Sequence, residues 1–336
     1  MFKRILLALA LTTTPTLAQV YQGSIGTYSI VMQLEKDLSG KYAYLSKGLS
    51  LELKGQQHQG TLTLTEQVFD REKGGVKTTG TFQLKSTGQG YTGTWKAPGS
   101  AKSLQVQLKP VPTTASYKLP VSSGLKKLQQ EDPYNFTLLN HPWVKLKDGT
   151  VQEPFSKVEY PRLTGRPQLN LALQDLQLQE AAYALDCLSM GEGFDGAEWD
   201  SRTRVTLQNT VLYSIRTDTY MYCGGAHPDT MSTGHVFDLK TGRKLTLSAF
   251  WDKLTPSKQR ALYMERYVQQ ADPDCVNALQ GETSDTFEWT LTPKGLALWP
   301  NFLPHVMAAC GEEVILPYSA LKAYARSGSV YLKTLR

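Results

Sequence analysis

The sequence is poor in long apolar runs, in clustered positive charge and in catalytic motifs. After the first 18 residues no apolar run approaches the roughly 20 residues that a membrane-spanning helix needs, so we expect no transmembrane segment. The 36 basic and 30 acidic residues are spread along the chain, which argues against a nucleic-acid partner. The nucleophile elbow G-x-S-x-G, the zinc helix H-E-x-x-H and the Walker loop are missing, and no cofactor is expected.

The first 18 residues have the composition of a signal peptide. Lys3 and Arg4 give a positive start, residues 5–11 form an apolar run, and residues 16–18 (Thr-Leu-Ala) form a small-x-small cleavage motif. The apolar run is too short to span a bilayer. We therefore predict that residues 1–18 are a signal peptide and that the protein is exported, either to a periplasm or to the medium.

Cysteine is absent from the first half of the chain and occurs four times in the second, at Cys187, Cys223, Cys275 and Cys310. An even number of cysteines in an exported protein predicts disulfides. Three pairings are possible. We favour Cys187–Cys223 and Cys275–Cys310, which close loops of about 35 residues worth about 3–4 kcal/mol each. No C-x-x-C or H-x-x-x-H spacing is present, so no metal site is predicted.

Residues 19–112 have the pattern of an all-β domain. Leucines alternate with polar residues, as in 49–54 and 61–65, and glycine-containing turns recur about every ten residues. This spacing predicts an antiparallel meander with one buried face. Such a meander forms a small barrel or a sandwich, and the pattern does not distinguish the two.

The rest of the chain has a mixed pattern. Proline, serine and threonine near residues 110–124 predict a linker at 113–132. For 133–336 we predict an α+β domain with a mixed or antiparallel sheet and two to three helices. The expected helices cover 166–187, 255–270 and 317–325. The expected strands cover 204–207, 211–218, 219–223, 234–239, 244–247, 286–291, 295–299, 313–316 and 330–332.

The most unusual local segment follows Cys223 and consists of Gly224, Gly225, Ala226, His227 and Pro228. Two glycines allow backbone angles that other residues avoid, and the proline keeps the preceding residue out of a helix. Three interpretations are open: a structural turn beside a disulfide, a recognition surface, or a general base provided by the histidine.

The second half of the chain also resembles the extracytoplasmic domain of the RsiV-like/PdaC-like family. The similar segments are 214–215, 220–228 with its G-G-A-H element, 237–247 with D-L-x-T-G-[RK], 298–302 and 314–318. Together they place the resemblance at about residues 133–325.

This resemblance implies a binding role. In RsiV-like anti-sigma factors the domain faces outward and binds lysozyme, and in PdaC-like deacetylases it accompanies a separate catalytic domain. We therefore expect an exported, non-enzymatic protein that binds a cell-envelope glycan or an extracellular protein through residues 224–228. One alternative is an envelope hydrolase that uses His227 with Asp218, Asp229 or Asp238. A second alternative is a small-ligand carrier with its ligand inside the N-terminal β-domain.

Overall fold

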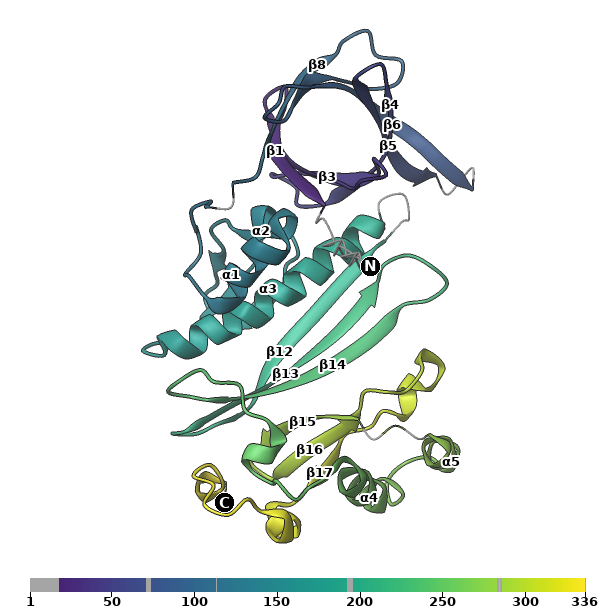
Figure 1. Cartoon of the computed structure of the whole chain (residues 1–336). Helices are drawn as coiled ribbons and strands as arrows, with labels where there is room; N and C mark the ends of the chain where they lie inside the picture. The colour runs from purple at the N-terminus through teal and green to yellow at the C-terminus, as the bar shows by residue number, and fades with distance from the viewer. Residues whose placement is uncertain are drawn as a thin grey trace, which may run out of the picture.

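The computed structural model describes residues 18–70, 74–112, 114–191, 196–282, 284 and 286–335 (Figure 1). The predicted signal peptide, apart from Ala18, lies outside the described residues. Within the described part of the chain, no helix is both long enough and apolar enough to cross a bilayer.

The N-terminal part is a closed antiparallel barrel of eight strands (Figure 1), which decides between the two architectures left open by the sequence. Each strand pairs with the next along the chain, and β1 closes the barrel by pairing with β8. The strands are β1 (Gln19–Ile25), β2 (Tyr28–Leu34), β3 (Gly40–Tyr44), β4 (Ser50–His58), β5 (Thr61–Asp70), β6 (Gly75–Ser86), β7 (Tyr91–Lys96) and β8 (Leu104–Pro110).

Strict alternation along the strands fills the barrel interior. In β5, Leu62, Leu64 and Glu66 are buried, whereas the residues between them are partly exposed. Tyr42 and Phe82 are fully buried, and their ring centroids lie 5.3 Å apart. Aliphatic side chains from β1, β2, β4, β6 and β8 complete this cluster. The space that a carried ligand would need is thus occupied by side chains.

The barrel interior also contains one buried carboxylate, that of Glu66. It accepts hydrogen bonds from the Tyr42 hydroxyl at 2.5 Å, the Thr79 hydroxyl at 2.6 Å and the Trp95 indole N–H at 3.1 Å. Three donors compensate for much of the hydration that the carboxylate loses on burial.

Three helices follow the barrel: α1 (Ser123–Glu131), α2 (Pro133–Leu139) and the long α3 (Pro167–Met190). Side-chain oxygens of Ser122 and Asp132 cap α1 and α2. Helix α1 lies inside the segment that the sequence predicts to be a linker, and its Leu125 is fully buried in a cluster formed mainly by α3. Helix α2 packs against the outside of the barrel through Tyr134 and Leu138.

Three small antiparallel sheets make up the rest of the structure, with two further helices. The first sheet contains β9 (Val144–Lys145), β10 (Thr150–Gln152) and β11 (Glu159–Pro161). The second contains β12 (Glu198–Gln208), β13 (Leu212–Tyr222) and β14 (Asp229–Asp238), and the third contains β15 (Phe287–Thr292), β16 (Gly295–Pro300) and β17 (Val314–Leu316). The helices are α4 (Pro256–Tyr267) and α5 (Pro273–Gly281), and short 3₁₀ turns are η1 (Leu247–Ala249), η2 (His305–Cys310), η3 (Tyr318–Tyr324) and η4 (Leu332–Thr334).

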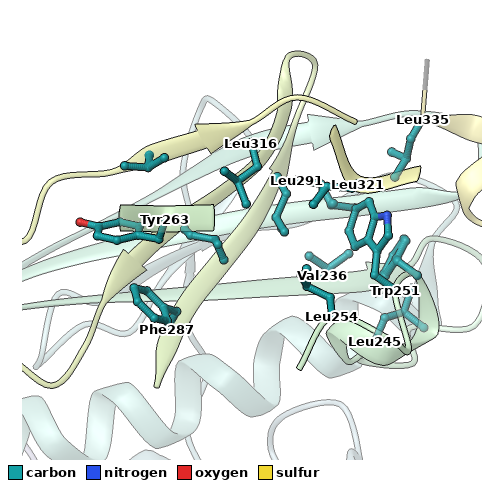
Figure 2. Packing of buried hydrophobic residues seen from close by; sticks show 14 of the residues in the cluster. Val236, Leu245, Trp251, Leu254, Tyr263, Phe287, Leu291, Leu316, Leu321 and Leu335 are labelled. Atoms are coloured by element: carbon teal, nitrogen blue, oxygen red, sulfur yellow. The ribbon is translucent and has the colours of Figure 1, made fainter. Parts of the chain in front are cut away.

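The β12–β14 sheet lies between α3 on one face and the β15–β17 sheet on the other (Figure 1). Alternation along β13 separates the two faces: Tyr213 and Ile215 join the cluster under α3, whereas Leu212 joins the cluster formed with the third sheet. Figure 2 shows that second cluster, in which Trp251 and Tyr263 pack with leucines from β15, β17 and η3. The central strand β13 is therefore buried on both faces at residues 212–215.

Most of the predicted regular elements are confirmed, with some corrections. The helices predicted at 166–187 and 255–270 correspond to α3 and α4. The strands predicted at 244–247 and 330–332 are wrong, because the first has only an isolated bridge at Lys244 and the second is a turn leading into η4. The helix predicted at 317–325 is a 3₁₀ turn. The described part of 133–336 contains four α-helices, α2 to α5, where two to three were predicted. Helices α1, α2 and α5 were not predicted, because seven to nine residues give little periodicity to detect.

Candidate functional site

The cysteines form two disulfides, Cys187–Cys223 and Cys275–Cys310, as the sequence favoured. The first ties the C-terminal part of α3 to the end of β13, directly before the predicted recognition loop. The second ties α5 to the last residue of η2. Two loop segments that are distant in sequence are therefore each fixed by a covalent bond at one end.

The segment Gly224–Pro228 is the turn between β13 and β14. Gly224 and Gly225 have φ angles of 90° and 108°, which a residue with a Cβ rarely adopts. The Tyr222 hydroxyl donates a hydrogen bond to the Gly225 carbonyl oxygen at 3.0 Å, and the His227 Nδ1–H donates one to the Pro228 carbonyl oxygen at 3.2 Å. Both the interpretation as a structural turn and the interpretation as an exposed surface are compatible with this geometry, because the His227 ring is exposed.

The unexpected partner of His227 is His305, from η2. The two imidazole rings stack face to face with their centroids 3.8 Å apart and their planes 9° from parallel. The Nδ1 atom of His305 lies 3.4 Å from a carboxylate oxygen of Asp229, the first residue of β14. We call residues 224–229 and 305–310 together the hairpin–η2 surface.

A small cleft of about 150 Å³ is lined by His305 and by Asp229, whereas residues 224–228 do not line it. Its lining includes Asp229, Ser232 and His305, together with Asn301 and Arg216. These side chains supply both donors and acceptors. A cleft of this size and polarity fits one small polar group of a larger ligand.

Arg216, one of the residues that line the cleft, belongs to an ion-pair network. The Arg216 guanidinium stacks on the Trp299 ring at 4.1 Å and makes ion pairs of 2.6 Å with both Asp218 and Glu313. Burial alone raises the pKa of Asp218, but the hydrogen bonds from Ser232 and Arg216 outweigh it, so the pKa lies below its ordinary value. Asp218 is therefore ionised at neutral pH and is engaged as a structural partner of Arg216.

The three carboxylates that the hydrolase interpretation assigned to His227 do not gather around it. Asp229 pairs with His305, Asp218 pairs with Arg216, and Asp238 lies at the opposite end of β14, where it accepts hydrogen bonds from the Thr241 hydroxyl and backbone N–H. Within the described residues, no group of three or more His, Cys, Asp or Glu side chains is placed to hold a metal ion. Sequence reasoning found the hairpin but missed His305, because no motif links it to residues more than 70 positions earlier.

Comparisons with known proteins give limited information. No protein-family model and no curated protein matches the chain. The solved structures that are similar to it include two DUF3298 family proteins. A DUF3298 family protein from Pseudomonas aeruginosa PAO1 is 20% identical, with a TM-score of 0.36 over 49% of this chain and 82% of that one. A member of the same family from Bacteroides fragilis NCTC 9343 is 15% identical, with a TM-score of 0.36 over 84% of this chain and 97% of that one. Scores this low support no transfer of fold or function.

Proposed function

We propose that this chain is an exported, non-enzymatic protein that binds a glycan of the cell envelope through the hairpin–η2 surface. The observation that carries the proposal is the stacking of His227, from the sequence-predicted loop, on His305, which lines a polar cleft together with Asp229. Both segments are fixed by disulfides. A recognition surface benefits from such fixing, because less conformational freedom is lost on binding.

Export is supported by the cysteines. Disulfides persist in oxidising compartments, and both pairs here close loops that a reducing cytosol would leave open. The signal-peptide pattern of residues 1–18 agrees with this location. We also interpret the barrel and the remainder of the chain as two domains, with the RsiV-like resemblance confined to the second.

A glycan suits the cleft better than a charged peptide does. Sugar hydroxyls donate and accept hydrogen bonds at once, and the Asn301 amide does the same. Asp229 accepts, Arg216 donates, and Ser232, whose hydroxyl proton goes to Asp218, can still accept. Arg216 already has two carboxylate partners, so it has little charge left to attract an acidic ligand. The stacked rings of His227 and His305 offer a flat, partly exposed edge beside these polar groups.

Co-sedimentation with insoluble peptidoglycan tests the proposal. We expect the purified protein to be retained and the His227→Ala/His305→Ala double variant to be lost to the supernatant. A His58→Ala variant, altered on an exposed histidine of the barrel, is the matched control and should be retained. Equal retention of the double variant and wild type would contradict the site assignment.

Two further outcomes of the same experiment identify other functions. A lysozyme added in solution should not be captured; its capture by wild type, and not by the double variant, would point instead to an extracellular protein partner. Release of soluble glycan fragments that is lost in the double variant would favour the hydrolase interpretation.

A further inference from the structure

A second hollow, unrelated to the hairpin–η2 surface, lies at the N-terminal end of α3. It has a volume of about 720 Å³ and lies between the segment 118–121, the residues that follow α2, β10 and the first two turns of α3. This volume is within the range of small-molecule sites. We call it the α3 groove.

The lining of the α3 groove is apolar with an unbalanced positive charge. Its walls include Leu119, Trp143 and Leu171, and the described lining contains two cations, Lys118 and Arg162, and no acidic residue. Apolar walls with one charged group are the ordinary composition of a site for an amphipathic small molecule.

Arg162 is the unusual member of this lining. Its guanidinium donates to the carbonyl oxygens of Tyr160 and Pro161 at 3.3 and 3.0 Å and to the side-chain oxygen of Gln177 at 2.6 Å. These three bonds leave at least two of its five N–H donors unused. No carboxylate in the described part of the chain lies within ion-pair distance of it.

The surroundings disfavour this charge. Burial lowers the pKa of Arg162 to about 10. Only the phenol groups of Tyr160 and Tyr213 counter this effect, and no carboxylate does. An arginine held in a partly buried site by neutral acceptors alone gains from any anion that reaches it, because the interaction is strengthened by the low local dielectric.

The N-terminus of α3 adds to the positive potential of the groove. This helix of 24 residues has no acidic residue in its first turn, and its N-cap residue, Arg166, makes no capping bond through its side chain. Pro167 and Asn170 of the first turn line the groove. The positive end of the helix dipole thus faces the same space as Arg162.

We propose that the α3 groove binds a small amphipathic carboxylate, with the carboxylate on Arg162 and the hydrocarbon body against Leu119, Trp143 and Leu171. Arginine is suited to this task, because its planar fork donates two parallel hydrogen bonds to one carboxylate. The charge complementarity identifies the ligand class: an alcohol would leave the guanidinium without a counter-charge, and an amine would repel it.

Isothermal titration calorimetry of the full chain with three probes of equal chain length tests the proposal. The probes are octanoate, octan-1-ol and octylammonium. We expect octanoate to bind at least about 10-fold more tightly than octanol, since a hydrogen bond to a charged group contributes roughly 1.5–3 kcal/mol. Octylammonium should bind more weakly than either.

Two variants locate the binding. Arg162→Gln should bring octanoate down to the affinity of octanol, whereas Leu171→Trp, which fills the groove and leaves Arg162 in place, should abolish both. Should Arg162→Gln fail to fold, the probe series on wild type and Leu171→Trp still decides the question.

The proposal is overturned if octanol binds wild type as tightly as octanoate, if no probe binds at millimolar concentration, or if octanoate binds Leu171→Trp as well as wild type. None of these results bears on the hairpin–η2 surface, because both variants retain His227 and His305.

Discussion

Removing each disulfide in turn should destabilise the protein by the same amount. The two bonds span 36 and 35 residues, and the chain-entropy relation gives about 4 kcal/mol at 25 °C for a closed loop of either length. We expect the double variants Cys187→Ala/Cys223→Ala and Cys275→Ala/Cys310→Ala to lose this amount of unfolding free energy. Alanine avoids placing a hydroxyl at Cys187, which is only 2% exposed.

Urea unfolding followed by tryptophan fluorescence measures the loss, with wild type and both double variants compared under the same conditions. The two variants serve as controls for each other, since their spans differ by one residue. A loss below about 1 kcal/mol in either variant, or losses that differ two-fold, would refute the reasoning that loop closure in the unfolded chain is the source of the stability. Each variant should also weaken retention on peptidoglycan, because each frees one half of the hairpin–η2 surface.

Two further changes test the packing and the pH response. Gly234→Ala should lower the free energy of unfolding by at least about 1 kcal/mol in urea titrations, because its Cβ would lie 2.1 Å from the Trp289 carbonyl oxygen. Gly281→Ala is the control and should be neutral, because no atom lies within 4 Å of the added Cβ. Equal effects of the two substitutions would contradict the steric explanation. Burial lowers the pKa of His235 to about 3. Between about pH 6.5 and 3 the unfolded chain therefore binds a proton at this histidine that the folded chain does not bind. The free energy of unfolding consequently decreases as the pH falls through this range, by at most about 1.4 kcal/mol per pH unit. His235→Phe should flatten this acid limb while His58→Gln should not, and an unchanged slope in His235→Phe would contradict the assignment.

The elements that sequence patterns predict well here are those whose pattern repeats. The alternation of Leu62 and Leu64 with threonines survives in β5, because one face of the strand points into the barrel. The same pattern cannot choose between barrel and sandwich, since closure depends on the pairing of β1 with β8, which are more than 80 residues apart. The preferred disulfide pairing is confirmed, and each disulfide joins cysteines that are neighbours along the sequence, 36 and 35 residues apart.

The polar contacts that define both proposed sites are of the kind that sequence patterns do not reveal. The stacking of His305 on His227 and the isolation of Arg162 each depend on how distant segments are placed by packing. An arginine without a carboxylate partner has no signature along the chain, because its partners are backbone carbonyls and an amide. Similarly, the sequence pattern predicts that the carboxylate of Glu66 faces solvent. Only closure of the barrel buries it beside Tyr42 and Trp95.

Hydrogen–deuterium exchange of the whole protein, with and without soluble peptidoglycan fragments, tests the central claim most directly. We expect the fragments to slow exchange in the peptides that contain residues 224–229 and 305–310, with little change in the barrel. Protection confined to the barrel, or no protection anywhere at saturating fragment, would contradict the assignment of the hairpin–η2 surface as the binding site.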